Sequence, residues 1–392
     1  MNIFVSGLGC ISAAGKNLKE TLISFQKEKV NAGTVSIFET VLNSPVFEVN
    51  LTDEYISENK MRTHVLAEYA VKEALEGAGL TLDILSKFKV GICLGTTVAS
   101  QLNDLEYYRS YRESGNGPMK TIDRYLNGNL AAALKEKYKL NGPGLTIVNA
   151  CSSGTDAIGA AMSWLESGIC DIAIAGGADE LNPIPYSGFN SLGITSEVCC
   201  RPFDKNRTGL NLGEGAGILV LETDAVAKKR GIKPKLKLSG YGTYADAYHL
   251  TAPRPDGSGL INAIRYAVKK SDININDVSF VNAHGTATPD NDKVEGHVFK
   301  ELFNQNIKFL STKGYTGHTL GAAGGLEAVF TCAALNNGWI PKSVGFEVFD
   351  EDVGLAPVAE RTEIAGNIAI STSLAFGGNN SALIFEKIIS PY

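Results

Sequence analysis

Apolar runs and helix-like segments alternate from one end of the chain to the other. The apolar runs are short and rich in β-branched residues, which predicts buried strands. They lie at residues 3–6, 90–94, 145–148, 171–175, 218–221, 236–238, 278–281, 308–310, 368–370 and 382–385. The helix-like segments lie at residues 61–78, 130–138, 155–166, 260–270 and 320–335. This alternation predicts an α/β fold with buried, mainly parallel or mixed sheets.

A weak internal repeat divides the chain. Residues 3–12, with the sequence IFVSGLGCIS, resemble residues 236–245, with the sequence LKLSGYGTYA. The spacing of later features differs between the two copies, so the repeat indicates related structure and is not a strict sequence repeat. The charged stretch at 225–235 separates the copies. We therefore expect two related α/β halves, residues 1–232 and 233–392.

Composition restricts the compartment and the possible ligands. Hydrophobic residues make up 44% and charged residues 20% of the 392 positions, as in ordinary globular proteins. No run of about 18 apolar residues occurs, so we expect no membrane span. Seven cysteines without a CxxC pair favour a reduced, cytoplasmic location, and Cys/His spacing typical of zinc sites is absent. The net charge of −6 argues against nucleic acid as a partner, and an acidic protein partner would need a local basic patch.

The sharpest chemical feature is Cys151, in a tight turn between a predicted strand and a predicted helix. The segment from residue 146 reads TIVNACSSGTDAIGAA. A helix N-terminus favours the thiolate, and the small neighbours let a substrate approach the backbone. On this segment alone a buried structural cysteine fits as well as a nucleophile, because free cysteines are among the most buried residues. Four other cysteines lie in apolar patterns and are interpreted as structural: Cys10, Cys93, Cys170 and Cys332.

Two histidines occupy similar junctions. His284 follows a buried strand in VNAHGTATPDND, and His318 opens a small-residue helix five residues after Lys313. Each histidine alone is more often structural, but a histidine at such a junction can act as an acid, a base or a donor to an oxyanion. Together with Cys151 they indicate a Cys/His/His pocket. The segment AFGGNNSALIF, from residue 375, can present backbone N–H groups to an anion, although Gly-Gly alone usually marks a turn.

Taken in order, these segments resemble the β-ketoacyl-acyl-carrier-protein synthases of the thiolase superfamily. The resemblance covers nearly the whole chain. It rests on VSGLGCISAAG, NACSSG, AGGADE, RPFDKNRTGLNLGEGAG, DAYHLTAP, NAHGTATPDND, STKGYTGHTLGAAGGLEA and AFGGNNSALIF. It implies a five-layered αβαβα fold, with the cysteine in one half and both histidines and the lysine in the other, and usually a dimer.

The resemblance also implies the chemistry. Cys151 would take an acyl group from acyl carrier protein, and malonyl carrier protein would lose CO2 and extend that fatty-acid, polyene or polyketide chain by two carbons. His284 and His318 would assist decarboxylation, and Lys313 would hold the electrostatics of the site with Glu327. The backbone N–H groups of Cys151 and Phe376, the latter a gating aromatic, would form the oxyanion hole.

Further residues are expected to contact substrate or carrier. Thr286 and Thr288 match hydroxyls that contact the phosphopantetheine arm, and Phe189 and Gly377 are expected to bind substrate. No cofactor is expected, because carrier-bound phosphopantetheine holds the substrates. The candidates for docking an acidic carrier protein are Lys60, Arg62 and Lys120.

Position 318 discriminates among relatives. Initiating synthases carry asparagine there and thiolases carry a second cysteine near the C-terminus, whereas this chain has His318 and no cysteine after Cys332. Both features favour the elongating, carrier-dependent type. Two alternatives stay open: the active subunit of a heterodimer with a cysteine-less chain-length factor, and a Cys–His hydrolase, which would leave Lys313 and the second histidine without a role. Residues 188–201 are trimmed and 96–114 differ from familiar fatty-acid enzymes, which leaves the chain length and the pathway undecided.

Overall fold

The computed structural model describes residues 1–51, 61–97, 105–119, 129–303 and 306–389. Five strands form the sheet of the first half: β1 (Ile3–Ser12), β2 (Val90–Gly95), β3 (Gly144–Ile147), β4 (Ile172–Asp179) and β5 (Gly215–Thr223). Their order across the sheet is β3-β2-β4-β5-β1. β2 runs parallel to β3 and β4, whereas β5 is antiparallel to β4 and β1.

The second half repeats this arrangement strand for strand. Its sheet contains β6 (Leu236–Ala245), β7 (Val278–Asn282), β8 (Lys308–Leu310), β11 (Ile368–Ala375) and β12 (Asn379–Lys387). Read from its own edge, the order is β8-β7-β11-β12-β6, with parallel and antiparallel pairs in the same places. A short antiparallel pairing of β1 with β6 joins the two into one ten-stranded sheet. The two-copy architecture expected from the repeat is therefore present, while the boundary between residues 232 and 233 stays a prediction.

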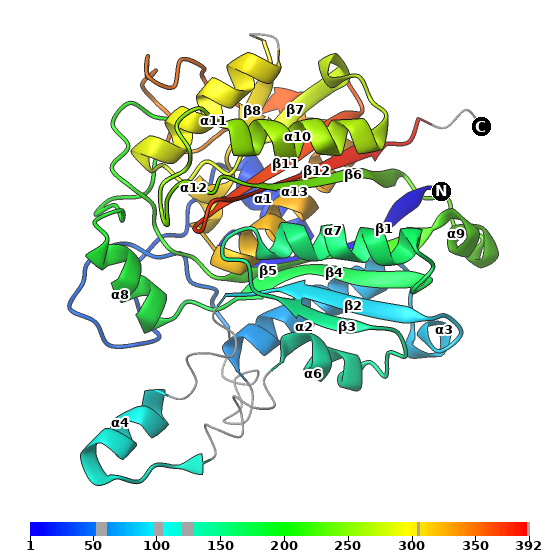
Figure 1. The fold of residues 1–392 in the computed structure, drawn as a ribbon, viewed down its shortest axis with the longest axis horizontal. Coiled ribbons are helices and arrows are strands. Elements are labelled where there is room, and N and C mark those ends of the chain that lie inside the picture. Colours follow the sequence, from blue (N-terminus) through cyan, green and yellow to red (C-terminus); the bar gives the residue numbers. More distant parts are fainter. Residues whose placement is uncertain (52–60, 98–104, 120–128, 304–305, 390–392) are drawn as a thin grey trace.

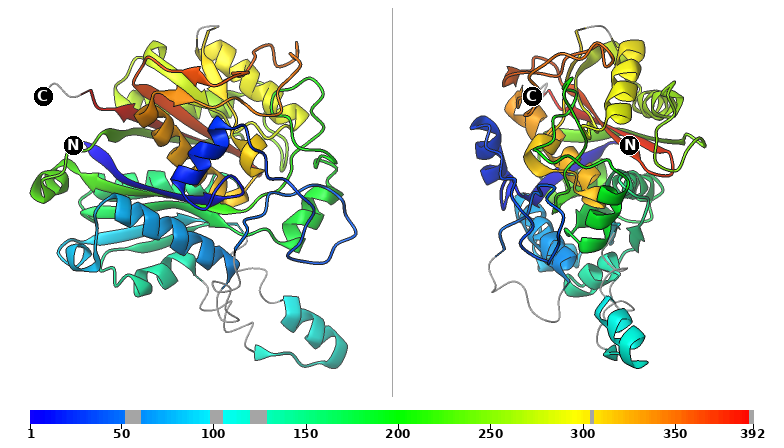
Figure 2. Two further views of the ribbon diagram at one scale, coloured as in Figure 1. Left: turned by 180° about the vertical axis from the view of Figure 1, so that it is seen from behind. Right: turned by 90° about the vertical axis from the view of Figure 1, so that its left-hand side faces the viewer.

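Helices form three layers around the two five-stranded units (Figure 1). Between the units lie α7 (Ser153–Glu166) and α13 (Ala323–Asn337), which pack against each other and against strands of both units. On the outer face of the first unit lie α2 (Arg62–Gly77) and α6 (Leu130–Lys137), and α10 (Ser258–Ser271) covers the second unit with α11 (Pro289–Leu302) beside it. This gives the αβαβα layering expected for the fold class, and the start of β1 and the end of β12 lie at one end of the molecule (Figure 2).

Smaller elements complete the chain. The helices are α1 (Leu18–Gln26), α3 (Leu82–Leu85), α4 (Leu105–Ser114), α8 (Pro183–Ser191), α9 (Asp224–Arg230) and α12 (Lys313–Thr316), with 3-10 turns η2 (Ile275–Asp277) and η3 (Leu320–Ala322). Strands β9 (Trp339–Ile340) and β10 (Thr362–Glu363) pair separately. Among the described residues, no helix is both long and apolar enough to cross a membrane.

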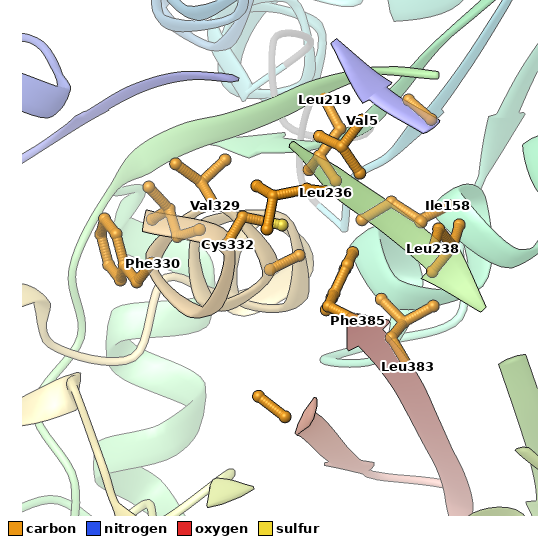
Figure 3. Close-up of a cluster of buried hydrophobic side chains, with 14 of the residues drawn as sticks. Val5, Ile158, Leu219, Leu236, Leu238, Val329, Phe330, Cys332, Leu383 and Phe385 are labelled. Atoms are coloured by element: carbon orange, nitrogen blue, oxygen red, sulfur yellow. The ribbon is translucent and has the colours of Figure 1, made fainter. Parts of the chain in front are cut away.

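The central layer carries the core that unites the halves. Ile158 of α7 and Val329 of α13 pack with Leu219, Leu238 and Phe385 from strands of both units (Figure 3). Burial of such apolar surface is the main favourable contribution to folding. The predicted structural cysteines Cys10, Cys93, Cys170 and Cys332 all lie buried in this core, so their interpretation as apolar packing residues agrees with the structure.

Glycines allow the two central helices to touch. A Cβ on Gly154 of α7 would lie 2.7 Å from the backbone nitrogen of Gly325 in α13, closer than real Cβ contacts. A Cβ on Gly325 would in turn lie 2.4 Å from the carbonyl oxygen of Gly217 in β5. The small-residue segments of the sequence therefore bring the N-terminal ends of α7 and α13 into direct backbone contact.

Candidate active site

Internal symmetry explains why the cysteine and one histidine meet. Cys151 lies between β3 and α7, and His318 lies between β8 and α13, which are the corresponding positions of the two halves. Because α7 and α13 start side by side, their preceding loops converge. The Nε2 atom of His318 lies 3.1 Å from the Sγ atom of Cys151.

His284 and Phe376 reach the same site from the ends of two neighbouring parallel strands. His284 follows the C-terminal end of β7, and Phe376 follows the C-terminal end of the adjacent β11. The imidazole rings of His284 and His318 meet edge to face, with centroids 5.2 Å apart. The backbone N–H of Phe376 donates toward the Cys151 sulfur. The predicted nucleophile, both histidines and one predicted oxyanion donor therefore share one site.

Burial controls the protonation of these groups. Desolvation raises the pKa of Cys151 to about 12, and this outweighs the opposing effects of Lys313 and the Phe376 N–H. Burial therefore opposes the thiolate that the helix N-terminus was expected to favour, because Cys151 is shielded from water. Burial, and then the Lys313 charge, also lowers the pKa of both His284 and His318 well below the usual value, so both imidazoles are neutral at neutral pH.

Lys313 joins the catalytic candidates through one buried ammonium. Its Nζ donates to a carboxylate oxygen of Glu327 and to the backbone carbonyl of His284. The same Nζ lies 3.3 Å from Nδ1 of His284. An ammonium has only donors, so Nδ1 accepts and the single proton of the neutral ring resides on Nε2. Lys313 thereby turns an N–H of His284 toward the pocket.

A carboxylate that the sequence interpretation missed holds the His284 loop. Glu295 of α11 accepts hydrogen bonds from the backbone N–H of His284 at 2.8 Å and of Gly285 at 2.6 Å. Burial raises the pKa of Glu295 to about 7, and these backbone donors oppose the rise. Its position eleven residues after His284, on the buried face of a helix, is the signal that could have identified it.

The cysteine opens into a cavity of about 350 Å³. The walls include the predicted residues Phe189, Phe376, Thr286 and Thr288. The rings of Phe189 and Phe376 stack with centroids 5.4 Å apart, and the hydroxyls of Thr286 and Thr288 lie 2.9 Å from each other. Further lining residues come from two loops whose individual roles were not predicted: Leu192, Gly193, Ile194, Thr251, Ala252 and Pro253.

The cavity suits a thioester on a narrow arm. Apolar walls with a few convergent hydroxyls are typical of sites that bind small organic ligands. Gly377 lies beside the wall and adopts φ +85°, a conformation that glycine tolerates best. Its N–H donates to the carbonyl of Leu250 at 2.8 Å, so this donor is engaged within the protein.

The structure does not bring the predicted carrier-docking residues together on a described surface. Lys60 and Lys120 lie outside the described residues. Arg62, the first residue of α2, is paired internally: its Nε donates to Glu214 at 2.7 Å and its guanidinium also reaches the carbonyl of Val49 at 2.7 Å. Only 13% of its side chain is exposed, which leaves little of it for a partner protein. The segment around Arg62 could not reveal Glu214, which is 152 residues away in the sequence.

Comparisons with known proteins agree with this geometry. The description "Beta-ketoacyl synthase, N-terminal domain" matches residues 54–227, and "Beta-ketoacyl synthase, C-terminal domain" matches residues 237–347. The chain is 32% identical to the 3-oxoacyl-[acyl-carrier-protein] synthase 2 of Synechocystis sp., over 98% of each chain.

Solved structures share the fold over the same length. A chain of the ishigamide ketosynthase/chain length factor superposes with a TM-score of 0.93 at 29% identity, covering 99% of each chain. The ketosynthase ApeO in complex with its chain length factor ApeC, from Xenorhabdus doucetiae, gives a TM-score of 0.84 at 28% identity, over 99% of this chain and 98% of that one. With both family domains in order and full-length relatives, the chain belongs to the β-ketoacyl synthase family.

Proposed function

We propose that Cys151 accepts an acyl group from acyl carrier protein and that the site then condenses it with malonyl carrier protein. The observation that carries this proposal is the 3.1 Å contact between Cys151 and His318, with His284 at the same cavity. In the first step the sulfur attacks the carrier thioester, and a tetrahedral intermediate expels the carrier thiol. The backbone N–H groups of Cys151 and Phe376 would stabilise the oxyanion.

The fate of the thiol proton follows from burial. Because the pKa of Cys151 is raised, the sulfur keeps its proton until it attacks. The neutral His318 Nε2 is the neighbouring group that can accept this proton and return it to the departing carrier thiol. The acylation step then begins and ends without net charge in a buried site.

Decarboxylation of malonyl carrier protein would use both imidazoles as donors, with His318 in the tautomer that carries its proton on Nε2 once Cys151 is acylated. The C–C bond to the carboxylate breaks, CO2 leaves, and its electron pair becomes an enolate on the thioester. The Nε2–H of His284, oriented by Lys313, and the His318 imidazole would stabilise the enolate oxygen, a charge that develops only during the reaction. The enolate carbon attacks the acyl-Cys151 carbonyl, the Cys151 thiolate is expelled, and it takes up one proton from solvent. Carrier-bound substrates and these side chains supply every group the reaction needs, and we propose that no further cofactor takes part.

A second role rests on two observations. The named neighbours come from complexes of a ketosynthase with a chain length factor, at 28–29% identity. In this chain, β3 is an edge strand, with Leu145 and, just beyond the strand, Val148 well exposed. Unpaired edges of this kind invite pairing with another chain. We therefore propose that the chain acts as a dimer, either with itself or as the active subunit beside a cysteine-less homologue. The free cysteines support a reducing, cytoplasmic location.

Intact-protein mass spectrometry tests the proposal. The chain is incubated with acyl carrier proteins of several acyl lengths, alone and with any cysteine-less homologue encoded beside it. A single acyl adduct on the wild type and none on Cys151→Ala is the expected result. An equal adduct on Cys151→Ala would overturn the assignment of the nucleophile. An adduct formed only with the homologue present would establish the heterodimer.

A further inference from the structure

Asp156 is a buried carboxylate close to the nucleophile that the proposed mechanism does not use. It lies in α7, five residues after Cys151, and only 7% of it is exposed. A carboxylate is costly to bury unless hydrogen bonds satisfy its oxygens. Four side-chain donors point at this one group, two on each oxygen, and they come from both halves of the molecule.

Two of these donors belong to the turn that carries Cys151. The side-chain amide of Asn149 donates to Oδ2 of Asp156 at 2.5 Å, and the hydroxyl of Ser152 is 2.8 Å from the same oxygen. These residues flank Cys151 on both sides. Between them Ala150 has φ +49°, a left-handed conformation that residues with a Cβ adopt rarely. The Asp156 carboxylate therefore holds a strained turn close to the reactive sulfur by two hydrogen bonds.

The other two donors come from the second half. The hydroxyl of Tyr241, on β6, lies 2.9 Å from Oδ1 of Asp156, and the hydroxyl of Ser381, on β12, donates to the same oxygen. Burial, and then the Asp156 charge, raises the pKa of Tyr241, so the phenol stays protonated and remains a donor. The Asp156 carboxylate thus links the cysteine turn of the first half to two adjacent strands of the second half.

A glycine in the same helix makes this link possible. The ring of Tyr241 lies directly on Gly159, where a Cβ would come within 2.4 Å of ring carbons. Gly159 is nearly one helical turn beyond Asp156, so the ring lies along α7 and its hydroxyl reaches the carboxylate. The glycine at position 159 therefore leaves room for the ring whose hydroxyl reaches Asp156, five residues after Cys151.

We propose that Asp156 is a positioning residue that holds Cys151 at the contact distance from His318 by tying the cysteine turn to β6 and β12. The inference rests on the proposed role of Cys151 as the nucleophile and extends it. His318 belongs to the half that contains Tyr241 and Ser381, so the tie fixes the sulfur relative to the imidazole across the boundary between the halves. Sub-ångström placement matters because a nucleophile displaced by about 1 Å can lose about 100-fold in rate.

The test separates acylation from decarboxylation, because only the first requires the sulfur. Asp156→Asn keeps the shape of the side chain but removes the charge and one acceptor oxygen, so two of the four donors lose their acceptor and a hydroxyl on that side can stay bonded only by accepting from the new amide. Tyr241→Phe and Ser381→Ala each remove one donor of the second half and leave the charge and the turn contacts in place. Ser163→Ala is the matched control, because its hydroxyl lies on the same helix and donates only to the carbonyl of Gly159.

Rapid-quench mass spectrometry gives the rate constant for acylation of Cys151, and CO2 release gives malonyl decarboxylation. We expect Asp156→Asn to lower the acylation rate constant by about tenfold or more, with a smaller fall in Tyr241→Phe and Ser381→Ala. Decarboxylation should stay within about twofold in all three, and Ser163→Ala should match the wild type in both.

Each other outcome counts against the inference. Acylation at the wild-type rate in Asp156→Asn, or in both donor variants if Asp156→Asn does not fold, would overturn it while leaving the proposed function intact. Parallel loss of acylation and decarboxylation would mean that Asp156 only supports the fold. A wild-type chain that gains no acyl adduct, or gains it equally as Cys151→Ala, would overturn the proposed function and this inference with it.

Discussion

Replacing Lys313 with methionine tests whether the buried ammonium organises the site. Methionine keeps the length of the side chain and removes only the charge and the donors. The change leaves Glu327 buried without its cation and leaves the His284 carbonyl and Nδ1 without the Nζ donor. Breaking a buried ion pair from one side costs about 3–5 kcal/mol, whereas an exposed pair is worth about 1 kcal/mol or less. We therefore expect Lys313→Met to lower the free energy of unfolding by about 3–5 kcal/mol at pH 8.

The stability lost in Lys313→Met should become smaller as the pH falls. Burial already raises the pKa of Glu327 while Lys313 opposes it, so removal of Lys313 raises that pKa further. Between the unfolded and the folded pKa, the folded variant binds more protons than the unfolded chain. Its stability relative to the wild type must therefore recover as the pH falls from 8 toward about 7, the pKa of Glu327 in the wild type, by up to about 1.4 kcal/mol per pH unit, and should change little below that.

A double-mutant cycle tests this prediction. The free energy of unfolding in urea is measured for the wild type, Lys313→Met, Glu327→Gln and the double variant. The double variant leaves no unpaired charge, so it should be more stable than Lys313→Met at pH 8 and should lose the pH-dependent recovery. A single variant that costs less than about 1 kcal/mol at pH 8 would show that the pair behaves like an exposed one. A double variant no more stable than Lys313→Met would refute the reasoning about an uncompensated carboxylate.

Three further results are expected. Cys151→Ala should abolish condensation but continue to release CO2 from malonyl carrier protein, because the imidazoles remain; loss of both activities would contradict the separate roles. In that variant the rate of decarboxylation should stay level from pH 8 down through 6.5, because burial lowers the pKa of His284 and His318, and an acid limb centred at pH 6.5 would show ordinary, solvated histidines. Gly154→Ala should lower the free energy of unfolding by about 1–3 kcal/mol in urea titrations by forcing α7 from α13, and an unchanged value would mean that the helices separate freely.

Local apolar runs were sufficient to locate all ten strands of the large sheet. Strand ends were less well predicted: β6 continues to Ala245, seven residues beyond its predicted end, because its small and polar residues are held by pairing with β12. Helices with weak apolar patterns were missed. The nine residues of α8 contain two prolines and a glycine, and α11 begins with five polar or proline residues. Their helical state depends on the surfaces they cover and, in α8, on the Asn182 cap, which periodicity does not report.

Some residues of the candidate site could be identified from the sequence, and others could not. Strand-to-helix junctions in the sequence singled out Cys151, His284 and His318, and the family resemblance added Lys313 with its role. The resemblance made Arg62 a candidate for carrier docking, whereas the fold pairs it with Glu214. It also overlooked Asp156 and Glu295, whose importance comes from the donors that face them and not from their own neighbours in the chain.

The sequence by itself determined the family, the two-copy α/β architecture and the residue types of the site, since these depend on local pattern and ordered motifs. Only the tertiary structure decided how those residues meet. Cys151 and His318 are 167 positions apart and come together because corresponding loops of two similar halves converge at the starts of α7 and α13. Tertiary structure also decided the protonation states, because desolvation arises only when the assembled core excludes water from the thiol and the imidazoles.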